Sequence, residues 1–153
     1  MAKFVYRMQS ILEIKEKLEE QARLAFAQAN KRLADEEEKL QKLQERKVFY
    51  EEQGRALQED NLSVMEIMEN RDAIAMMRDY ILIQQDEVAK AEQFVEEMRQ
   101  KLAEARMESK MHNKLKEKAF ENFLAEEKAA ESKEVDELTS YVYGQRDSEQ
   151  EVR

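Results

Sequence analysis

IMENRDAIAMMRDYILIQQDEVAKAEQFVEEMRQKLAEA, residues 67–105, is the stretch of sequence that decides the fold. A β-branched residue or leucine recurs at every seventh position, at Ile67, Ile74, Ile81, Val88, Val95 and Leu102. Three residues after each of these lie Asn70, Met77, Gln84, Ala91, Met98 and Ala105. The two series form the a and d positions of a heptad seam, which leaves water only by packing against another helix in a left-handed supercoil.

The composition points to long helices rather than a compact core. The chain has 153 residues, no proline and two glycines, Gly54 and Gly144, so few turns are available. Charged residues make up 40% of the chain and apolar residues 42%, a profile typical of coiled coils. We therefore expect one domain in which each helix buries a single stripe.

Several classes of function are disfavoured. The formal net charge of −9 argues against nucleic-acid binding, and the lack of cysteine excludes disulfides and thiolate metal sites. Two isolated glycines cannot form a phosphate-binding loop, and His112, the single histidine, occupies a d-type position suited to packing at the rim of the seam. The longest apolar run, Tyr80–Ile83, is too short to span a bilayer. We expect a soluble, cytoplasmic, non-enzymatic protein without a cofactor or metal.

A second stripe indicates the partner helix, over residues 4–57. Its members are Met8, Ile11, Leu18, Ala22, Ala25, Ala29, Leu33, Leu40, Leu43, Lys47, Tyr50, Gly54 and Leu57, with Lys15 filling one seam position. Two successive steps of four residues around Ala29 predict a stutter, which locally unwinds a coiled coil. This stutter is either a tolerated irregularity or a place where the hairpin bends.

The predicted fold is all-α, a long two-helix antiparallel coiled coil with an overhanging C-terminal helix. Turn-forming residues place the break at 58–63, and Ser63-Val-Met-Glu66 has the capping-box pattern of a helix start. Helix two should run over about 63–143, capped by Gly144, with a disordered tail at 145–153. The short connection pairs residue i with roughly residue 122 − i. Helix two should then overhang helix one from about Ala119.

Two groups of residues near the turn exceed what a seam requires. The aromatic residues Phe49, Tyr50 and Tyr80 cannot all be covered by two helices, so they either form a docking surface or flank the seam. The methionine group, which is Met65, Met68, Met76 and Met77, either makes adaptable protein contacts or packs over the end of the hairpin.

The expected overhang carries an apolar face of its own. Phe120, Phe123 and Leu124 are spaced i, i+3 and i+4, and Val135, Leu138 and Val142 continue the pattern. An apolar helical face without a partner in its own chain is suited to binding another protein. Self-association is the alternative.

The order of several motifs resembles the FliJ family of the bacterial flagellar type III export apparatus. The motifs are the opening Phe4-Val-Tyr-Arg-Met-Gln-Ser-Ile-Leu12, Tyr50 before the break, Tyr80-Ile81, and the closing Glu131-Ser-Lys-Glu-Val-Asp-Glu-Leu138. The last is similar to the family's Lys-x-x-Asp-Glu signature, at Lys133, Asp136 and Glu137. The resemblance covers nearly the whole chain.

The resemblance implies an antiparallel coiled coil similar to the central stalk of rotary ATPases. FliJ proteins bind the hexameric export ATPase FliI, the cytoplasmic part of the gate protein FlhA, and export chaperones. The flank formed by Leu43, Arg46, Tyr50 and Tyr80 would meet the gate. The end carrying both termini would enter the ATPase ring, with Phe120, Phe123, Leu124, Val135 and Leu138 as the binding residues.

The sequence analysis therefore predicts a stalk that couples the export ATPase to the export gate, peripheral to the cytoplasmic membrane at the flagellar base. The alternative is a generic coiled-coil scaffold or the central stalk subunit of another rotary ATPase. A transcript-cleavage factor, with Glu59 and Asp60 at its tip, would need a globular docking domain that the pattern does not contain.

Overall fold

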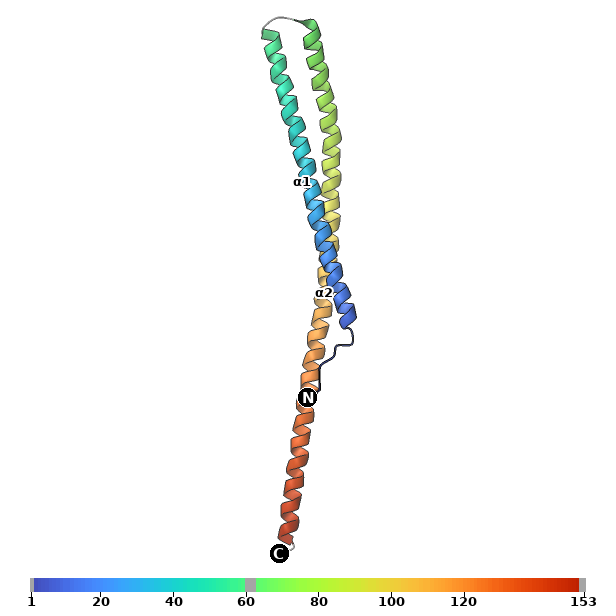
Figure 1. The fold of residues 1–153 in the computed structure, drawn as a ribbon, viewed down its shortest axis with the longest axis vertical. Coiled ribbons are helices and arrows are strands. Elements are labelled where there is room, and N and C mark those ends of the chain that lie inside the picture. The colour runs from blue at the N-terminus through green and yellow to red at the C-terminus, as the bar shows by residue number, and fades with distance from the viewer. Residues whose placement is uncertain (1, 60–62, 152–153) are drawn as a thin grey trace. The chain divides into compact units, whose positions relative to one another are not determined.

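Two long helices make up most of the structure, a computed structural model that describes residues 2–59 and 63–151. Helix α1 spans Gln9–Glu59 and helix α2 spans Val64–Glu151, with no strand among the described residues. Figure 1 shows α1 and the first part of α2 side by side and antiparallel. The predicted all-α hairpin is confirmed.

The contacts divide the chain into two units. One unit, Leu18–Arg106, contains most of α1 and the first half of α2. The other combines Met1–Lys17 with Met107–Arg153, so the start of the chain packs on the second half of α2. We call these the hairpin unit and the terminal unit.

The predicted seam on α2 is the face that the helix buries. Met77, Ile81, Ala91, Met98 and Leu102 are buried, and the other a and d positions from Ile67 to Ala105 are half-buried. The spacing of covered positions continues into the terminal unit, through the buried Ser109 and half-buried residues as far as Glu127.

The seam on α1 differs from the prediction in two ways. The structure buries Leu12 and half-buries Glu19, whereas the predicted Ile11 and Leu18 are exposed. With half-buried Phe26 and Glu36 both in the seam, the covered positions alternate in steps of four and three through Ala29, so the predicted stutter there was wrong. The prediction skipped the two glutamates because they are charged, although each side chain finds a partner on α2.

The pairing of the helices follows the expected register. Within the hairpin unit, Glu36 contacts Gln84 and Tyr50 contacts Asn70. Within the terminal unit, Lys15 pairs with Glu108. These pairs agree with the 122 − i rule to within about two residues, as expected for a short connection between antiparallel neighbours.

Both helix starts are marked by local hydrogen bonds. The Gln9 amide donates to the Tyr6 carbonyl at 3.2 Å, so α1 begins at Gln9 rather than near Phe4. At α2 the Glu66 amide donates to Ser63 Oγ at 3.5 Å, in agreement with the predicted cap. The predicted turn at 58–63 falls partly on residues 60–62, which lie outside the described residues.

Helix α2 runs through Gly144 to Glu151, so the predicted cap and the tail starting at 145 were wrong. A C-terminal glycine cap requires a left-handed backbone, and no glycine in the described chain has positive φ. Helical contacts continue beyond it, since Gln145 Nε2 donates to the Tyr141 hydroxyl at 3.0 Å. An exposed glycine inside a helix costs only about 1 kcal/mol.

The uncovered part of α2 starts later than predicted. Residues 3–8, in the segment before α1, line a hollow together with Ala119, Phe123 and Glu126 of α2. Half-buried positions on α2 end at Glu127, and the described residues after it are all exposed. The overhang therefore begins after Glu127 rather than at Ala119.

Candidate functional site

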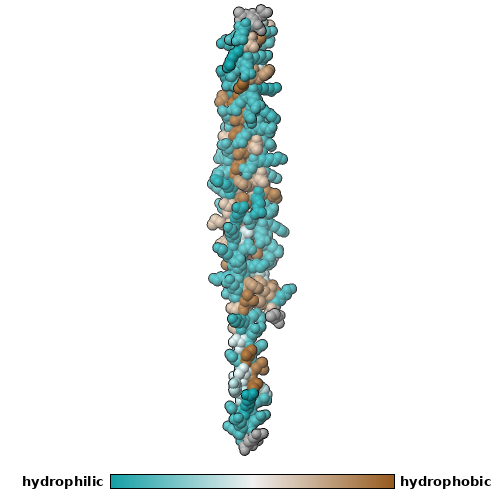
Figure 2. Space-filling view, turned by 90° about the vertical axis from the view of Figure 1, so that its left-hand side faces the viewer, coloured by the Kyte–Doolittle hydropathy of each residue, from teal (hydrophilic) through white to brown (hydrophobic). Residues whose placement is uncertain are grey.

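Two exposed apolar surfaces are the candidate functional sites, one in each unit. Figure 2 shows that hydrophilic side chains cover most of the visible face, with hydrophobic residues in an interrupted band among them. Contiguous exposed apolar groups on such a polar surface mark interaction sites.

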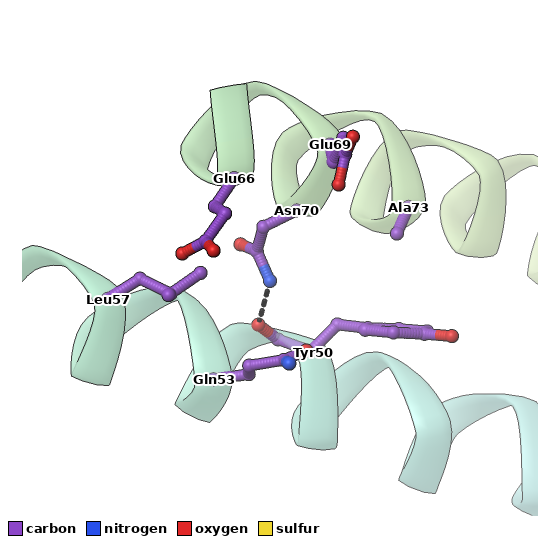
Figure 3. A pocket seen from close by; sticks show the side chains of 7 residues that line it. All are labelled: Tyr50, Gln53, Leu57, Glu66, Glu69, Asn70 and Ala73. Carbon is purple, nitrogen blue, oxygen red and sulfur yellow. Dashed lines mark hydrogen bonds between the residues drawn. The ribbon is translucent and has the colours of Figure 1, made fainter. Parts of the chain in front are cut away.

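Tyr50 belongs to the hairpin unit and is half-buried on the seam of α1. Its main-chain carbonyl accepts a hydrogen bond from Asn70 Nδ2 at 2.8 Å (Figure 3). Its ring packs edge-on against Phe49, with the ring centroids 5.8 Å apart, and Phe49 is 60% exposed. The helix-to-helix bond fixes the backbone from which this aromatic pair projects.

Tyr80 and Arg46 lie along one edge of the seam. Two heptads away on that edge, the Arg32 guanidinium lies 5.9 Å from the Phe94 ring centroid. Arg46 follows Arg32 by two heptads and Tyr80 precedes Phe94 by two heptads, so the repeat returns both to the same edge. Tyr80 is 46% exposed.

Neighbours on each helix extend this edge into an apolar patch. Phe49 lies one turn from Arg46, while Met76 and Ile83 lie one turn on either side of Tyr80, and all three are exposed. We call these five residues the edge patch. Phe49 and Met76 were expected near the turn, but Ile83 was not, although its i+3 spacing from Tyr80 could have identified it.

Leu43 adjoins the edge patch through Arg46. With Arg46, Lys39 and Lys42 it lines a hollow of about 540 Å³, completed by Glu45 and Gln84. Of the four residues assigned to gate binding, the structure therefore places Leu43 and Arg46 together, and Arg46 shares an edge with Tyr80. Tyr50 lines a separate hollow of about 470 Å³ with Leu57 and Asn70 (Figure 3).

The methionine group divides between core and surface. Met77 is buried on the seam, whereas Met65, Met68 and Met76 are exposed. Met77 therefore serves packing, and Met76 belongs to the edge patch.

Gln84, which lines the same hollow as Leu43, forms a polar layer in the seam with Glu36. Gln84 Nε2 donates to the Glu36 carbonyl oxygen at 3.0 Å and to its carboxylate Oε2 at 2.5 Å. This side-chain hydrogen bond, assisted by the charges of Lys39 and Arg32, outweighs desolvation and lowers the pKa of Glu36. The carboxylate is therefore held ionised where two helices meet.

The terminal unit carries a second polar section of the seam. Lys15 Nζ lies 2.7 Å from Glu108 Oε2, and this hydrogen bond and the lysine charge lower the pKa of Glu108. Ser109 beside it is buried, and His112 is half-buried with no hydrogen-bond partner for Nδ1 in the described structure. Ser109 and His112 lie on the packed face of α2, which fits a structural role.

The residues assigned to ATPase binding, Phe120, Phe123, Leu124, Val135 and Leu138, all lie on α2 in the terminal unit. At 100° per residue, Phe120, Leu124, Val135, Leu138 and Val142 fall within about 60° of one another around the helix. These residues, which include Val142 in place of Phe123, are all exposed, and we call them the α2 stripe. Phe123 lies on the seam side of this stripe and is half-buried.

Phe4 contacts the start of the α2 stripe, which the sequence analysis expected to be uncovered. The Phe4 ring centroid lies 5.2 Å from that of Phe120 and 5.4 Å from that of Phe123. The aromatic residue at position 4 and the apolar spacing at 120–124 were visible in the sequence, but nothing in the sequence links them.

Two features of the described residues bear on the class of protein. Across 2–59 and 63–151, no group of three or more histidine, cysteine or acidic side chains is placed to hold a metal ion. Neither helix, over the part that the structure describes, has a stretch long and apolar enough to cross a membrane.

Comparison with known proteins agrees with this architecture. The flagellar FliJ protein of Bacillus subtilis is 26% identical over 136 residues, covering 89% of this chain and 92% of that protein. A solved structure of a putative YscO homolog, CT670 from Chlamydia trachomatis, matches with a TM-score of 0.63 and 19% identity, over 95% of this chain and 99% of the other, which shows a shared fold.

The family model described as Flagellar FliJ protein matches residues 4–148, which includes all of α1, α2 as far as Ser148, and most of the segment before α1. The match extends over the edge patch and the α2 stripe alike. This chain therefore belongs to the flagellar FliJ protein family, of the flagellar type III export apparatus.

Proposed function

We propose that the protein is a non-enzymatic stalk of flagellar type III export, which couples the export ATPase ring to the membrane export gate and also interacts with export chaperones. It would act in the cytoplasm, peripheral to the membrane at the flagellar base. Family membership supports the place in export. One observation carries the coupling role: each unit exposes an apolar surface that the packing of α1 on α2 leaves uncovered.

The α2 stripe is the proposed ATPase surface. An exposed helical face with residues at i, i+4 and i+3 spacings is suited to a groove on another protein, which would bury it. Val135 and Leu138 lie beyond Glu127, where no described residue of the chain covers α2. A partner that takes up this face therefore displaces nothing from that part of the helix.

The edge patch, with Leu43 and Tyr50 near it, is the proposed gate surface. It combines Phe49, Tyr80 and Arg46, and aromatic and arginine side chains are enriched among the residues that dominate binding energy in interfaces. The Asn70–Tyr50 hydrogen bond and the Glu36–Gln84 layer hold the two helices in register beneath it. The surface is thereby ordered before a partner arrives.

Coupling requires that binding at one surface change the affinity at the other. Helix α2 contributes Met76, Tyr80 and Ile83 to the edge patch and all five residues of the α2 stripe, without a break between them. The helix is therefore the physical connection through which an ATPase bound at one site would influence the gate at the other.

Binding measurements with separate surface variants test this function. Leu138→Asp should weaken binding to the purified export ATPase by at least tenfold, while Ser140→Asp, on the opposite side of the helix, should not. Tyr80→Ala should weaken binding to the cytoplasmic part of the gate, while Leu82→Ala, exposed on the other edge, should not.

The same measurements separate the alternatives. A generic scaffold would bind neither protein, and the stalk of another rotary ATPase would bind a ring but no flagellar gate. If both variants retain wild-type affinity for both partners, the proposed surfaces are wrong.

A further inference from the structure

We propose that residues 2–8 are a displaceable strap, which covers the start of the α2 stripe in the free protein and must leave it before the ATPase binds there. This inference rests on the proposed ATPase function of the stripe. It adds a regulatory step, because the site would be partly closed by the chain itself.

One aromatic side chain makes the central contact of the strap. Phe4 lies edge-on to Phe120, with an interplanar angle of 69°, and tilted by 50° against Phe123. Such aromatic arrangements are favourable, so the ring prefers this position to water. Phe4 itself is only half-buried, and Phe120 remains 44% exposed. The cover is therefore real but incomplete.

The backbone of the strap is weakly held. Residues 2–6 have no regular secondary structure, and the backbone bond from Gln9 to Tyr6 ties the strap only to the start of α1. Within the described residues, no backbone hydrogen bond joins the strap to α2. Removing the strap from α2 therefore breaks side-chain contacts alone.

Burial of the Tyr6 hydroxyl destabilises the closed state of the strap. Its hydroxyl is buried without a hydrogen-bond partner among the described residues. A buried polar group without a partner disfavours the closed state, because the hydroxyl would regain hydrogen bonds in water. Strap residues and Ala119, Asn122, Phe123 and Glu126 also line an open hollow of about 580 Å³, so solvent reaches the contact between the strap and α2.

Competition between strap and ATPase has a defined signature. Apparent affinity falls in proportion to the fraction of molecules with the site open. Phe4→Ala removes the central contact and should tighten ATPase binding by roughly threefold to tenfold. The matched control is Val5→Ala in the same strap, because Val5 is 75% exposed and should leave affinity unchanged.

A closed strap can be locked by chemistry because the native chain has no cysteine. Lys3 and Glu126 line the same hollow from the strap and from α2. In the full-length Lys3→Cys/Glu126→Cys variant, a short bismaleimide should link the two residues and weaken ATPase binding by at least tenfold. Each single-cysteine variant treated with the same reagent is the control.

The outcomes separate the strap from the function on which it rests. Tighter binding by Phe4→Ala together with weaker binding by the locked variant supports the strap. Unchanged or weaker binding by Phe4→Ala, while the wild-type protein binds, overturns the strap and leaves the ATPase surface standing. If no version of the protein, including the wild type, binds the ATPase, the proposed function itself fails.

Discussion

Asn70 of α2 packs against α1 at Gly54, in the space that the missing side chain of this glycine leaves. Its Nδ2 donates to the main-chain carbonyl of Tyr50 at 2.8 Å, and its Oδ1 would clash with a Cβ atom on Gly54. Polar residues at seam positions specify register in coiled coils, at some loss of stability. Gly54 is the residue that makes room for this one, so the two positions depend on each other.

We expect Gly54→Ala to change the stability of the hairpin very little on its own. Alanine gains about 1 kcal/mol over glycine inside a helix. Its Cβ would push the Asn70 side chain away and remove the hydrogen bond to Tyr50, a loss of about 1 kcal/mol. The two effects nearly cancel.

The coupling between the two positions is therefore the informative quantity. In an Asn70→Ala background no side-chain amide remains to be displaced, so Gly54→Ala should stabilise the protein by about 1 kcal/mol. Urea unfolding followed by circular dichroism measures the four variants of this cycle. Additive effects would show that Gly54 does not serve Asn70.

Leu12 and Ile11 provide a matched test of the seam on α1. Leu12 is 1% exposed and Ile11 is 40% exposed, although the two are adjacent and similar in size. Leu12→Ala should lower the free energy of unfolding by about 2–5 kcal/mol, and Ile11→Ala by less than about 1 kcal/mol. If both variants lose the same free energy of unfolding, Leu12 is not the seam residue that the structure shows.

The seam on α2 could be predicted because its a positions are uniformly β-branched or leucine, which fixes the period. The seam on α1 could be predicted only in part, since Glu19 and Glu36 occupy positions where an apolar residue is expected. Their charges are acceptable because Arg106 and Gln84 approach them from α2. Whether a charged seam residue finds a partner depends on the facing helix, so the pattern of α1 alone cannot predict it.

The candidate surfaces were predictable to different degrees. Spacing along a single helix is a local property, so the α2 stripe was visible in the sequence. The edge patch needed the pairing of two helices, which a register near 122 − i supplies only approximately. The contact of Phe4 with Phe120 and Phe123 joins segments more than a hundred residues apart through a stretch without periodicity, and no pattern encodes it.

Glu36 should make the stability of the hairpin depend on pH. Its pKa is lowered in the folded protein from an ordinary value of 4.5, chiefly by the hydrogen bond from Gln84. The carboxylate therefore stabilises the fold fully above its unfolded pKa, and this contribution is lost as the pH falls through the lower, folded value. The loss should begin as the pH falls below about 4.5 and should be complete only below the folded pKa.

Thermal unfolding between pH 7 and pH 3 checks the assignment. Glu36→Gln should lose part of the acid destabilisation seen in the wild type, and Gln84→Ala should lose most of the same part because the amide is the largest cause. The double variant should lose no more than Glu36→Gln alone. A pH dependence that none of these variants alters would assign the acid sensitivity to other carboxyl groups.

The end of α2 should change its protection when the ATPase binds. Helices gain most of their stability from packing, and the described residues after Glu127 are exposed on every side. Amide exchange over 128–151 should be fast in the free protein, while exchange over the seam around Met98 and Leu102, which are buried, should be slow. Addition of the ATPase should slow exchange over 128–151 and leave the seam unchanged.

Leu138→Asp should abolish this slowing, and Ser140→Asp should preserve it, because only the first alters the α2 stripe. Exchange over 128–151 that is already as slow as in the seam, or that ignores the ATPase, would show that this part of α2 is not the ring-binding element.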